Sequence, residues 1–148
     1  MPDKRIEEFY NSDCFLLIGM SRKRNNFAWG VYKSFAGVNR KVYALHPEGG
    51  EKNGVKFYTK IEELPEKPDA CIVCTDLKKN KSLISELADS GIKRCWFQWG
   101  SYDKDVLEEA GKHNIVPLTG CVLMYMPESS FLHRVHRFFY EIFKKGTD

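Results

Sequence analysis

Residues 14–30 read CFLLIGMSRKRNNFAWG, and the organisation of the whole chain can be worked out from them. The apolar run from Cys14 to Ile18 has no polar alternation, which predicts a strand covered on both faces, as in a parallel sheet between helix layers. Gly19 ends this run, and apolar residues at helical spacing begin at Phe27. The stretch therefore predicts a strand, a glycine turn and a helix in direct succession.

The loop between this strand and this helix is polar and basic. Its residues are Met20, Ser21, Arg22, Lys23, Arg24, Asn25 and Asn26, which supply a hydroxyl, three cations and two helix-capping side chains. A strand that turns through glycine into the amino end of a helix directs backbone N–H groups and the positive end of the helix dipole at one spot. We expect a phosphate-bearing ligand there. The alternative, from this stretch alone, is a solvated basic loop.

The chain length, the number of cysteines and the net charge narrow the class of protein. A chain of 148 residues fits one domain. Its five cysteines are an odd number, lie mostly in apolar runs and accompany neither a signal peptide nor an apolar span, which predicts a reduced, cytoplasmic protein. The formal net charge of +3, with acids and bases interspersed, is too small for a general nucleic-acid surface. We therefore expect neither nucleic acid nor membrane as a partner.

Strand and helix patterns alternate along the rest of the chain. After a short leading helix over residues 3–11, strands are predicted at 14–18, 41–45, 70–75, 93–99 and 115–118, with a short extended piece at 54–58, and helices at 27–35, 77–90 and 102–112. This alternation predicts an α/β fold with a mainly parallel sheet of five or slightly more strands. In such sheets ligands bind outside the carboxyl ends of the strands. The residues at those ends are Gly19 to Lys23, Leu45 to Pro47, Cys74 to Asp76, Gln98 to Gly100, and Gly120 with Cys121.

A nicotinamide dinucleotide site is the weaker interpretation of this edge. It would require G-x-G-x-x-G after the first strand and an acid near the end of the second. The first loop has a single early glycine, and the second strand ends in Leu45, His46 and Pro47. An NAD(P) site therefore stays only as an alternative.

The cysteines and histidines give no strong catalytic or metal motif. Cys71 and Cys74 have the spacing of a redox or metal motif, but residues three apart on a strand face opposite sides, so we expect their thiols to diverge. Cys121, near a strand end, is the best candidate for a reactive thiol, with a buried inert cysteine as the alternative. His133 and His136 lack a third ligand nearby, which disfavours a metal site.

The carboxyl-terminal segment, residues 127–145, is predicted to be an added amphipathic helix. Apolar residues recur at positions 131, 132, 135, 138, 139, 142 and 143. A stripe this wide either closes the domain or pairs two subunits as a homodimer.

Several motifs in fixed order carry a resemblance to a known family. They are Gly19-Met20-Ser21, Leu45-His46-Pro47, Pro68-Asp69-Ala70, Trp96 to Gly100, and Gly120 to Met124. In this order the chain resembles the small stand-alone CoA-binding domain proteins, which are similar to the nucleotide-binding domain of the succinyl-CoA ligase alpha subunit. The resemblance spans roughly residues 13–124 and implies a Rossmann-like three-layer sandwich, with residues 1–148 forming one CoA-binding domain.

The resemblance also implies a site for CoA or an acyl-CoA at the strand ends. The loop from Gly19 to Asn26 would approach the pyrophosphate, and Lys41 the ribose phosphate. Residues 74–76 and 98–100 would flank the adenosine and the pantetheine. The chain departs from the family at His46, where asparagine is usual, and at Trp99, where a smaller residue or proline is common. The full predicted set is Gly19, Met20, Ser21, Arg22, Lys23, Asn26, Lys41, His46, Pro47, Cys74, Thr75, Asp76, Gln98, Trp99, Gly100 and Cys121.

The predicted function is non-catalytic binding of CoA or an acyl-CoA, with regulation as its purpose. The ligase chemistry needs a second domain with a histidine that becomes phosphorylated, and this chain has no room for one. No nucleophile and base stand at a recognisable spacing either. The alternatives are an NAD(P)-dependent oxidoreductase-type domain, and a dimeric interaction protein with a vestigial crevice.

Overall fold

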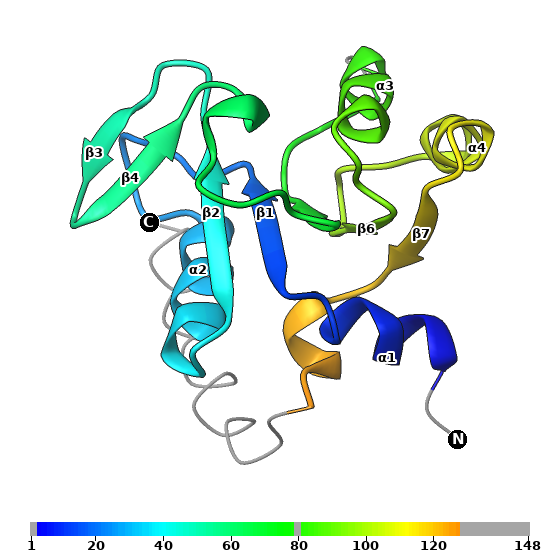
Figure 1. Cartoon of the computed structure of the whole chain (residues 1–148), viewed down its shortest axis with the longest axis horizontal. Coiled ribbons are helices and arrows are strands. Elements are labelled where there is room, and N and C mark those ends of the chain that lie inside the picture. Colours follow the sequence, from blue (N-terminus) through cyan, green and yellow to red (C-terminus); the bar gives the residue numbers. More distant parts are fainter. Residues whose placement is uncertain (1–2, 79–80, 128–148) are drawn as a thin grey trace.

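A computed structural model describes residues 3–78 and 81–127. Within these ranges the chain forms a seven-stranded sheet with the order β3-β4-β2-β1-β5-β6-β7. The strands are β1 (Cys14–Ile18), β2 (Lys41–Leu45), β3 (Gly50–Lys52), β4 (Val55–Tyr58), β5 (Ala70–Val73), β6 (Arg94–Phe97) and β7 (Val116–Thr119). All neighbours pair in parallel except β3 and β4. The chain winds outward from β1 to β2 first and from β5 to β7 afterwards, so the order reverses between β1 and β5 (Figure 1).

Helices cover both faces of this sheet. They are α1 (Lys4–Tyr10), α2 (Phe27–Gly37), α3 (Ser82–Asp89) and α4 (Lys104–Lys112), with short 3-10 turns η1 (Ile61–Glu63) and η2 (Val122–Tyr125). Phe15 and Leu17 of β1 enter a buried cluster with residues of α1, α2 and η2. Leu16 and Ile18 enter a second cluster with residues of α3 and α4. Because alternate residues of β1 enter alternate clusters, β1 is buried on both faces, and the prediction of a Rossmann-like three-layer α/β sandwich is confirmed.

The sheet has more strands than the five predicted ones, because a hairpin of β3 and β4 extends one edge. β3 and β4 pair in antiparallel fashion across a turn in which Asn53 and Gly54 both have positive φ, 52° and 80°. Asn-Gly is the usual sequence for a two-residue hairpin turn, so the chain did carry the signal for this hairpin. The parallel pairing of β4 with β2 then joins the hairpin to the sheet.

The helix predicted over residues 77–90 is shorter in the structure, where α3 spans Ser82–Asp89. Leu77 is buried, and its N–H donates to the carbonyl of Ser101 at 2.9 Å. That bond ties the segment after β5 to the loop after β6 instead of to a helix.

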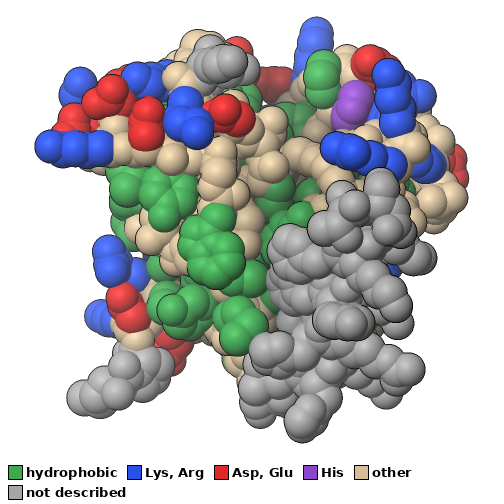
Figure 2. Space-filling view, turned by 180° about the vertical axis from the view of Figure 1, so that it is seen from behind, with side chains coloured by type: hydrophobic (Ala, Val, Ile, Leu, Met, Phe, Trp, Pro, Cys, Tyr) green, Lys and Arg blue, Asp and Glu red, His purple; other side chains and the backbone are tan. Residues whose placement is uncertain are grey.

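Exposed hydrophobic side chains remain in the described part of the chain, namely Trp99, Val116, Met124 and Tyr125. On the face shown in Figure 2, hydrophobic side chains gather at the centre and charged side chains gather along the upper rim. Apart from Pro127, the predicted helix over 127–145 lies outside the described residues. Among the helices in the described ranges, none is both long and apolar enough to cross a bilayer.

Candidate functional site

The reversal point of the sheet brings Gly19 against the backbone of Cys74. The N–H of Cys74 donates to the carbonyl of Ile18 at 2.8 Å, which extends the β1–β5 pairing to the strand ends. Gly19 has φ +118°, and a Cβ atom there would lie 2.7 Å from the carbonyl carbon of Cys74. No side chain fits in that space. Gly19 therefore brings backbone without a side chain to the point where doubly wound sheets bind nucleotides.

The loop after Gly19 is held in shape by its own side chains. Asn26 donates from Nδ2 to the carbonyl of Gly19 at 2.7 Å and accepts from the N–H of Ser21 at 3.3 Å. The Ser21 hydroxyl accepts from the N–H groups of Lys23 and Arg24, and Nε1 of Trp29 donates to the Ser21 carbonyl. Asn26 occupies the N-cap position of α2 without a side-chain capping bond, so its side chain closes the loop instead.

A cleft of about 480 Å³ opens beside these strand ends. Its lining includes five of the predicted residues, which the fold thus brings together: Gly19, Met20, His46, Pro47 and Thr75. The remaining lining residues are Ile18, Leu45, Thr59, Leu83 and Glu86. Thr59 follows β4, so the rule of strand ends would have found it had the extended piece at 54–58 been counted as a strand of the parallel sheet. Leu83 and Glu86 lie on α3, and only the packing of α3 over the sheet brings them here.

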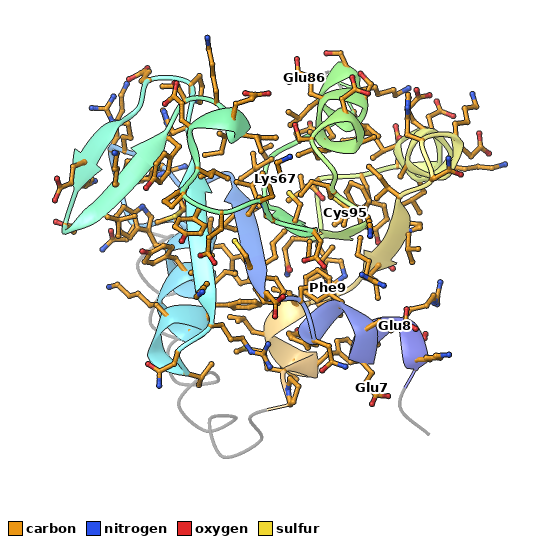
Figure 3. The ribbon with its side chains drawn as sticks, viewed as in Figure 1. Glu7, Glu8, Phe9, Lys67, Glu86 and Cys95 are labelled. Atoms are coloured by element: carbon orange, nitrogen blue, oxygen red, sulfur yellow. The ribbon has the colours of Figure 1, made fainter. Side chains whose placement is uncertain are left out.

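A second cavity, of about 650 Å³, continues from the cleft. The two share Leu45, Thr59 and Glu86 as lining residues. Lys67 and Glu86, both labelled in Figure 3, line this second cavity together with residues of η1 and the end of α3. Ligand sites commonly have volumes of roughly 300–1,000 Å³, so the groove formed by the two cavities has room for a dinucleotide-sized ligand.

The rim of the cleft carries an ion pair between two loops. Nη1 of Arg22 lies 2.9 Å from Oε2 of Glu48, which joins the β1–α2 loop to the turn after β2. That turn is compact, because the N–H of Gly49 donates to the His46 carbonyl and the N–H of Glu48 donates to Nδ1 of His46. The His46 ring packs against Phe57 with 5.6 Å between ring centroids. These contacts hold His46, which stands where the family usually has asparagine, in the wall of the cleft.

Several predicted residues lie at the same edge but do not line the cleft. Gln98 is buried, and its Oε1 accepts from the N–H of Val122 at 3.1 Å. Cys121 is buried in the core, whereas Trp99 is 70% exposed. The remaining residues of this group are Lys23 and Asp76, both exposed, and Gly100, whose φ is +85°. The fold thus uses Gln98 and Cys121 for its own packing.

Lys41 is the predicted residue that the structure does not bring to this site. It is the first residue of β2, so it lies at the amino edge, at the opposite end of the strand from His46. Its Nζ lies 2.9 Å from Oε1 of Glu66, and the hydroxyl of Tyr43 donates to Oε2 of the same carboxylate at 2.7 Å. Lys41 therefore lies away from the cleft in the structure, and its contact with the ribose phosphate stays a prediction.

The cysteines near the site are poor nucleophiles. Burial, together with the nearby Cys121, raises the pKa of the Cys74 thiol to about 12, so the thiolate is scarce at neutral pH. Cys71 belongs to the cluster under α3 and α4, whereas Cys74 packs against the cluster on the other face. The divergence expected from their spacing is therefore confirmed. Burial, and after it a hydrogen bond with Cys95, raises the pKa of Cys71.

The fold and the cleft together define a Rossmann-like domain with a groove at the carboxyl edge of its sheet. Residues 14–127 match the family described as the CoA binding domain. Because this match covers most of the chain, the protein belongs to that family, and the predicted resemblance is confirmed. Membership in the family supports CoA as the ligand.

Known relatives agree with this assignment at the level of family and fold. The chain is similar to the acetate–CoA ligase [ADP-forming] II subunit alpha of Pyrococcus furiosus, with 27% identity over 89 residues. That alignment covers 60% of this chain and 20% of the relative, so the chain spans about a fifth of the length of this curated protein.

Solved structures share the fold. A hypothetical protein from Pyrococcus horikoshii OT3 has a TM-score of 0.74 at 22% identity, covering 84% of this chain and 89% of that one. The dinucleotide forming acetyl-coenzyme A synthetase 1 of Ca. Korarchaeum cryptofilum, in its apo form, has a TM-score of 0.65 at 20% identity, covering 76% of this chain and 27% of that one.

Proposed function

We propose that this protein binds CoA or an acyl-CoA in the groove at the carboxyl edge of its sheet and catalyses no reaction on it. The observation that carries the proposal is the contact of Gly19 with Cys74, where a Cβ would lie 2.7 Å from backbone. Because this contact requires glycine, and Gly19 lines the cleft, backbone and no side chain borders the groove at this point, and a pyrophosphate needs that close approach. Family membership supports CoA over other nucleotides.

The chemistry of the lining supports a binding role. The titratable side chains that line the 480 Å³ cleft are His46 and Glu86. Nδ1 of His46 already accepts a hydrogen bond from the backbone of Glu48. The raised pKa of Cys74, about 12, disfavours a covalent role for the nearest thiol. A regulatory purpose, in which the protein reports CoA or acyl-CoA levels, fits a site of this kind.

Calorimetric titration of the purified protein with CoA and with acetyl-CoA tests the proposal. We expect saturable binding, and no binding of either at millimolar concentration would reject it. Titration with NADPH tests the alternative of a nicotinamide site. If NADPH saturates the protein and CoA does not, the groove belongs to an oxidoreductase-type domain.

Two matched variants test whether the groove is the site. Leu83 and Leu107 are both half-buried and pack against the same core cluster, but only Leu83 lines the cleft. We expect Leu83→Glu to weaken CoA binding at least about tenfold, because a carboxylate in the groove repels phosphate. Leu107→Glu serves as the control, with the same chemical change in the same layer. Equal losses in the two variants would reject this location.

We also propose a cytoplasmic homodimer. All five cysteines are free thiols, which suits a reducing compartment. Trp99, Met124 and Tyr125 are 70%, 45% and 52% exposed, and large exposed hydrophobic side chains are typical of interfaces. The predicted helix over residues 127–145 would contribute its apolar stripe. Removing residues 127–148 and measuring the mass in solution tests this, because an unchanged dimer would exclude the helix from the interface.

A further inference from the structure

Arg22 lies where a dinucleotide fold places the ribose of its ligand. In these folds an acid near the end of the second strand binds the ribose hydroxyls, and an arginine near it accommodates a ribose phosphate. Here β2 ends at Leu45, and the first acid after it is Glu48. The guanidinium of Arg22 reaches across from the β1–α2 loop and pairs with that acid at 2.9 Å.

The turn after β2 is shaped to receive this guanidinium. Gly50 has φ +89°, and a Cβ atom on it would lie 3.2 Å from Nη2 of Arg22. A side chain there would press on the guanidinium, whereas glycine leaves it room to lie against the turn. The Arg22 side chain is accordingly only 35% exposed, although it comes from a polar loop.

The two partners of this pair differ in how firmly they are held. The Glu48 side chain is 72% exposed, twice the fraction of Arg22. Glu48 can therefore swing into solvent while Arg22 stays against the turn. An exposed ion pair of this kind contributes little to stability, so a phosphate dianion, which accepts two parallel N–H bonds from a guanidinium, can take the place of the carboxylate.

We infer that Arg22 recognises a phosphate on the ribose of the bound nucleotide and that Glu48 holds Arg22 in place until this phosphate displaces it. This inference rests on the proposed function for its ligand, CoA, whose ribose carries a 3′-phosphate. The same chemistry would recognise the 2′-phosphate of NADPH. Arg22 would therefore recognise the phosphomonoester of the ligand, and the protein would bind CoA more tightly than dephospho-CoA.

The test compares calorimetric affinities for CoA and dephospho-CoA in the wild type, Arg22→Gln and Glu48→Gln, with NADPH and NADH as a second pair. We expect the wild type to bind CoA at least about tenfold more tightly than dephospho-CoA, which is the size of effect that charge-assisted hydrogen bonds produce. Arg22→Gln should remove this preference, because it should weaken the binding of CoA more than the binding of dephospho-CoA. Glu48→Gln should increase the preference, because the competing carboxylate is gone.

Arg5→Gln is the matched control. Arg5 also pairs with an acid, Asp3, at 3.0 Å, but it does not line the cleft and lies on α1, which Figure 1 shows on the opposite side of the molecule from the β3–β4 hairpin. We expect its preference for CoA to equal that of the wild type. A loss as large as that of Arg22→Gln would show a general charge effect and overturn the inference.

The remaining outcomes separate the inference from the proposed function. If the wild type binds CoA and Arg22→Gln weakens CoA and dephospho-CoA equally, or weakens neither, the inference is wrong and CoA binding stands. If only NADPH binds, and Arg22→Gln removes its advantage over NADH, Arg22 has the inferred role and the CoA proposal fails. Binding of none of the four nucleotides would overturn both. Should Arg22→Gln fail to fold, an unchanged preference in Glu48→Gln would overturn the inference.

Discussion

The amino and carboxyl edges of the sheet both carry basic residues beside a cavity, but they use their charges differently. At the amino edge a cavity of about 460 Å³ is lined by Lys41 and Glu66, which pair with each other at 2.9 Å. Tyr43 supplies a further bond to the same carboxylate. At the carboxyl edge the cleft is lined mainly by uncharged side chains and by the backbone at Gly19, and the Arg22–Glu48 pair stands on its rim.

This difference shows what separates a binding edge from a structural edge. Strand ends that meet through glycine bring backbone without a side chain to the cleft, and an exposed pair on a rim can exchange its acid for a ligand. A lysine that shares its carboxylate with a tyrosine hydroxyl has its charge compensated within the protein. The amino edge therefore resembles ordinary surface, whereas the carboxyl edge is open to an anion.

The largest effect should come from Gly19→Ala. A Cβ at this position lies 2.7 Å from the Cys74 carbonyl carbon and requires φ +118°. Backbone strain and overpacking together should cost about 2–5 kcal/mol of unfolding free energy, a large part of a typical domain's stability. Urea denaturation measures this cost.

Gly120→Ala is the control for Gly19→Ala. Gly120 has a similar φ of +105°, but the nearest atom to its added Cβ would be Tyr125 Cε2 at 3.5 Å, an ordinary contact. Gly120→Ala should therefore lower the unfolding free energy only by the part that comes from backbone strain. Equal losses in the two variants would mean that the close approach at the reversal point is not what makes this edge distinctive.

The next largest effect should come from Gln98→Ala. Removing Oε1 leaves the buried N–H of Val122 without its acceptor, which should lower the unfolding free energy by about 1–3 kcal/mol. Trp99→Ala, one residue further along and 70% exposed, should change stability by less than about 0.5 kcal/mol. Chemical denaturation of both variants compares them. If Gln98→Ala left the unfolding free energy unchanged but weakened CoA binding, Gln98 would act at the ligand site and not in the core.

A smaller effect is expected at the amino edge under acid. The hydrogen bonds of Glu66 with Lys41, and then with Tyr43, lower the pKa of its carboxyl from the usual 4.5. A depressed pKa means that the folded state binds this proton less readily than the unfolded state, so the stabilisation is present above pH 4.5 and is lost as pH falls through the native pKa. Glu66→Gln should therefore show a weaker loss of thermal stability than the wild type between neutral pH and about pH 3. Identical acid profiles would show that the pair contributes nothing.

The smallest effect should be that of Lys41→Gln on ligand affinity. Lys41 stands at the start of β2 and already pairs with Glu66, so calorimetry should give a CoA affinity within about twofold of the wild type. A tenfold loss would show that the ligand extends to the amino edge and would remove the contrast between the two edges.

Much of the fold could be predicted because its signals are local. The unbroken apolar run at 14–18 predicts a central buried strand, and alternation with helices predicts a parallel sheet. β4 matches the short extended piece predicted at 54–58, whereas β3 and the hairpin turn at Asn53-Gly54 were missed. The shortened α3 could not be predicted, because the bond from Leu77 to Ser101 joins residues far apart in the sequence.

The residues of the candidate site also divide into those that the sequence could place and those that it could not. The rule that ligands meet strand ends brought Gly19, His46 and Thr75 to one cleft from sequence alone. It could not distinguish Gln98, which follows its strand just as directly but turns its amide into the protein. Lys41 was predicted from the family resemblance and not from the rule of strand ends, and the structure places it at the start of β2, away from the cleft.

The amino-acid sequence by itself determined the family, the strand–glycine–helix unit around residue 19 and the set of strand ends that could hold a ligand, because apolar periodicity and turn residues act over a few neighbours. Only the tertiary structure decided which of those ends share a cleft, that Leu83 and Glu86 of α3 complete it, and that Arg22 lies against the turn after β2. These placements depend on how distant segments pack against each other, and no local pattern contains that information.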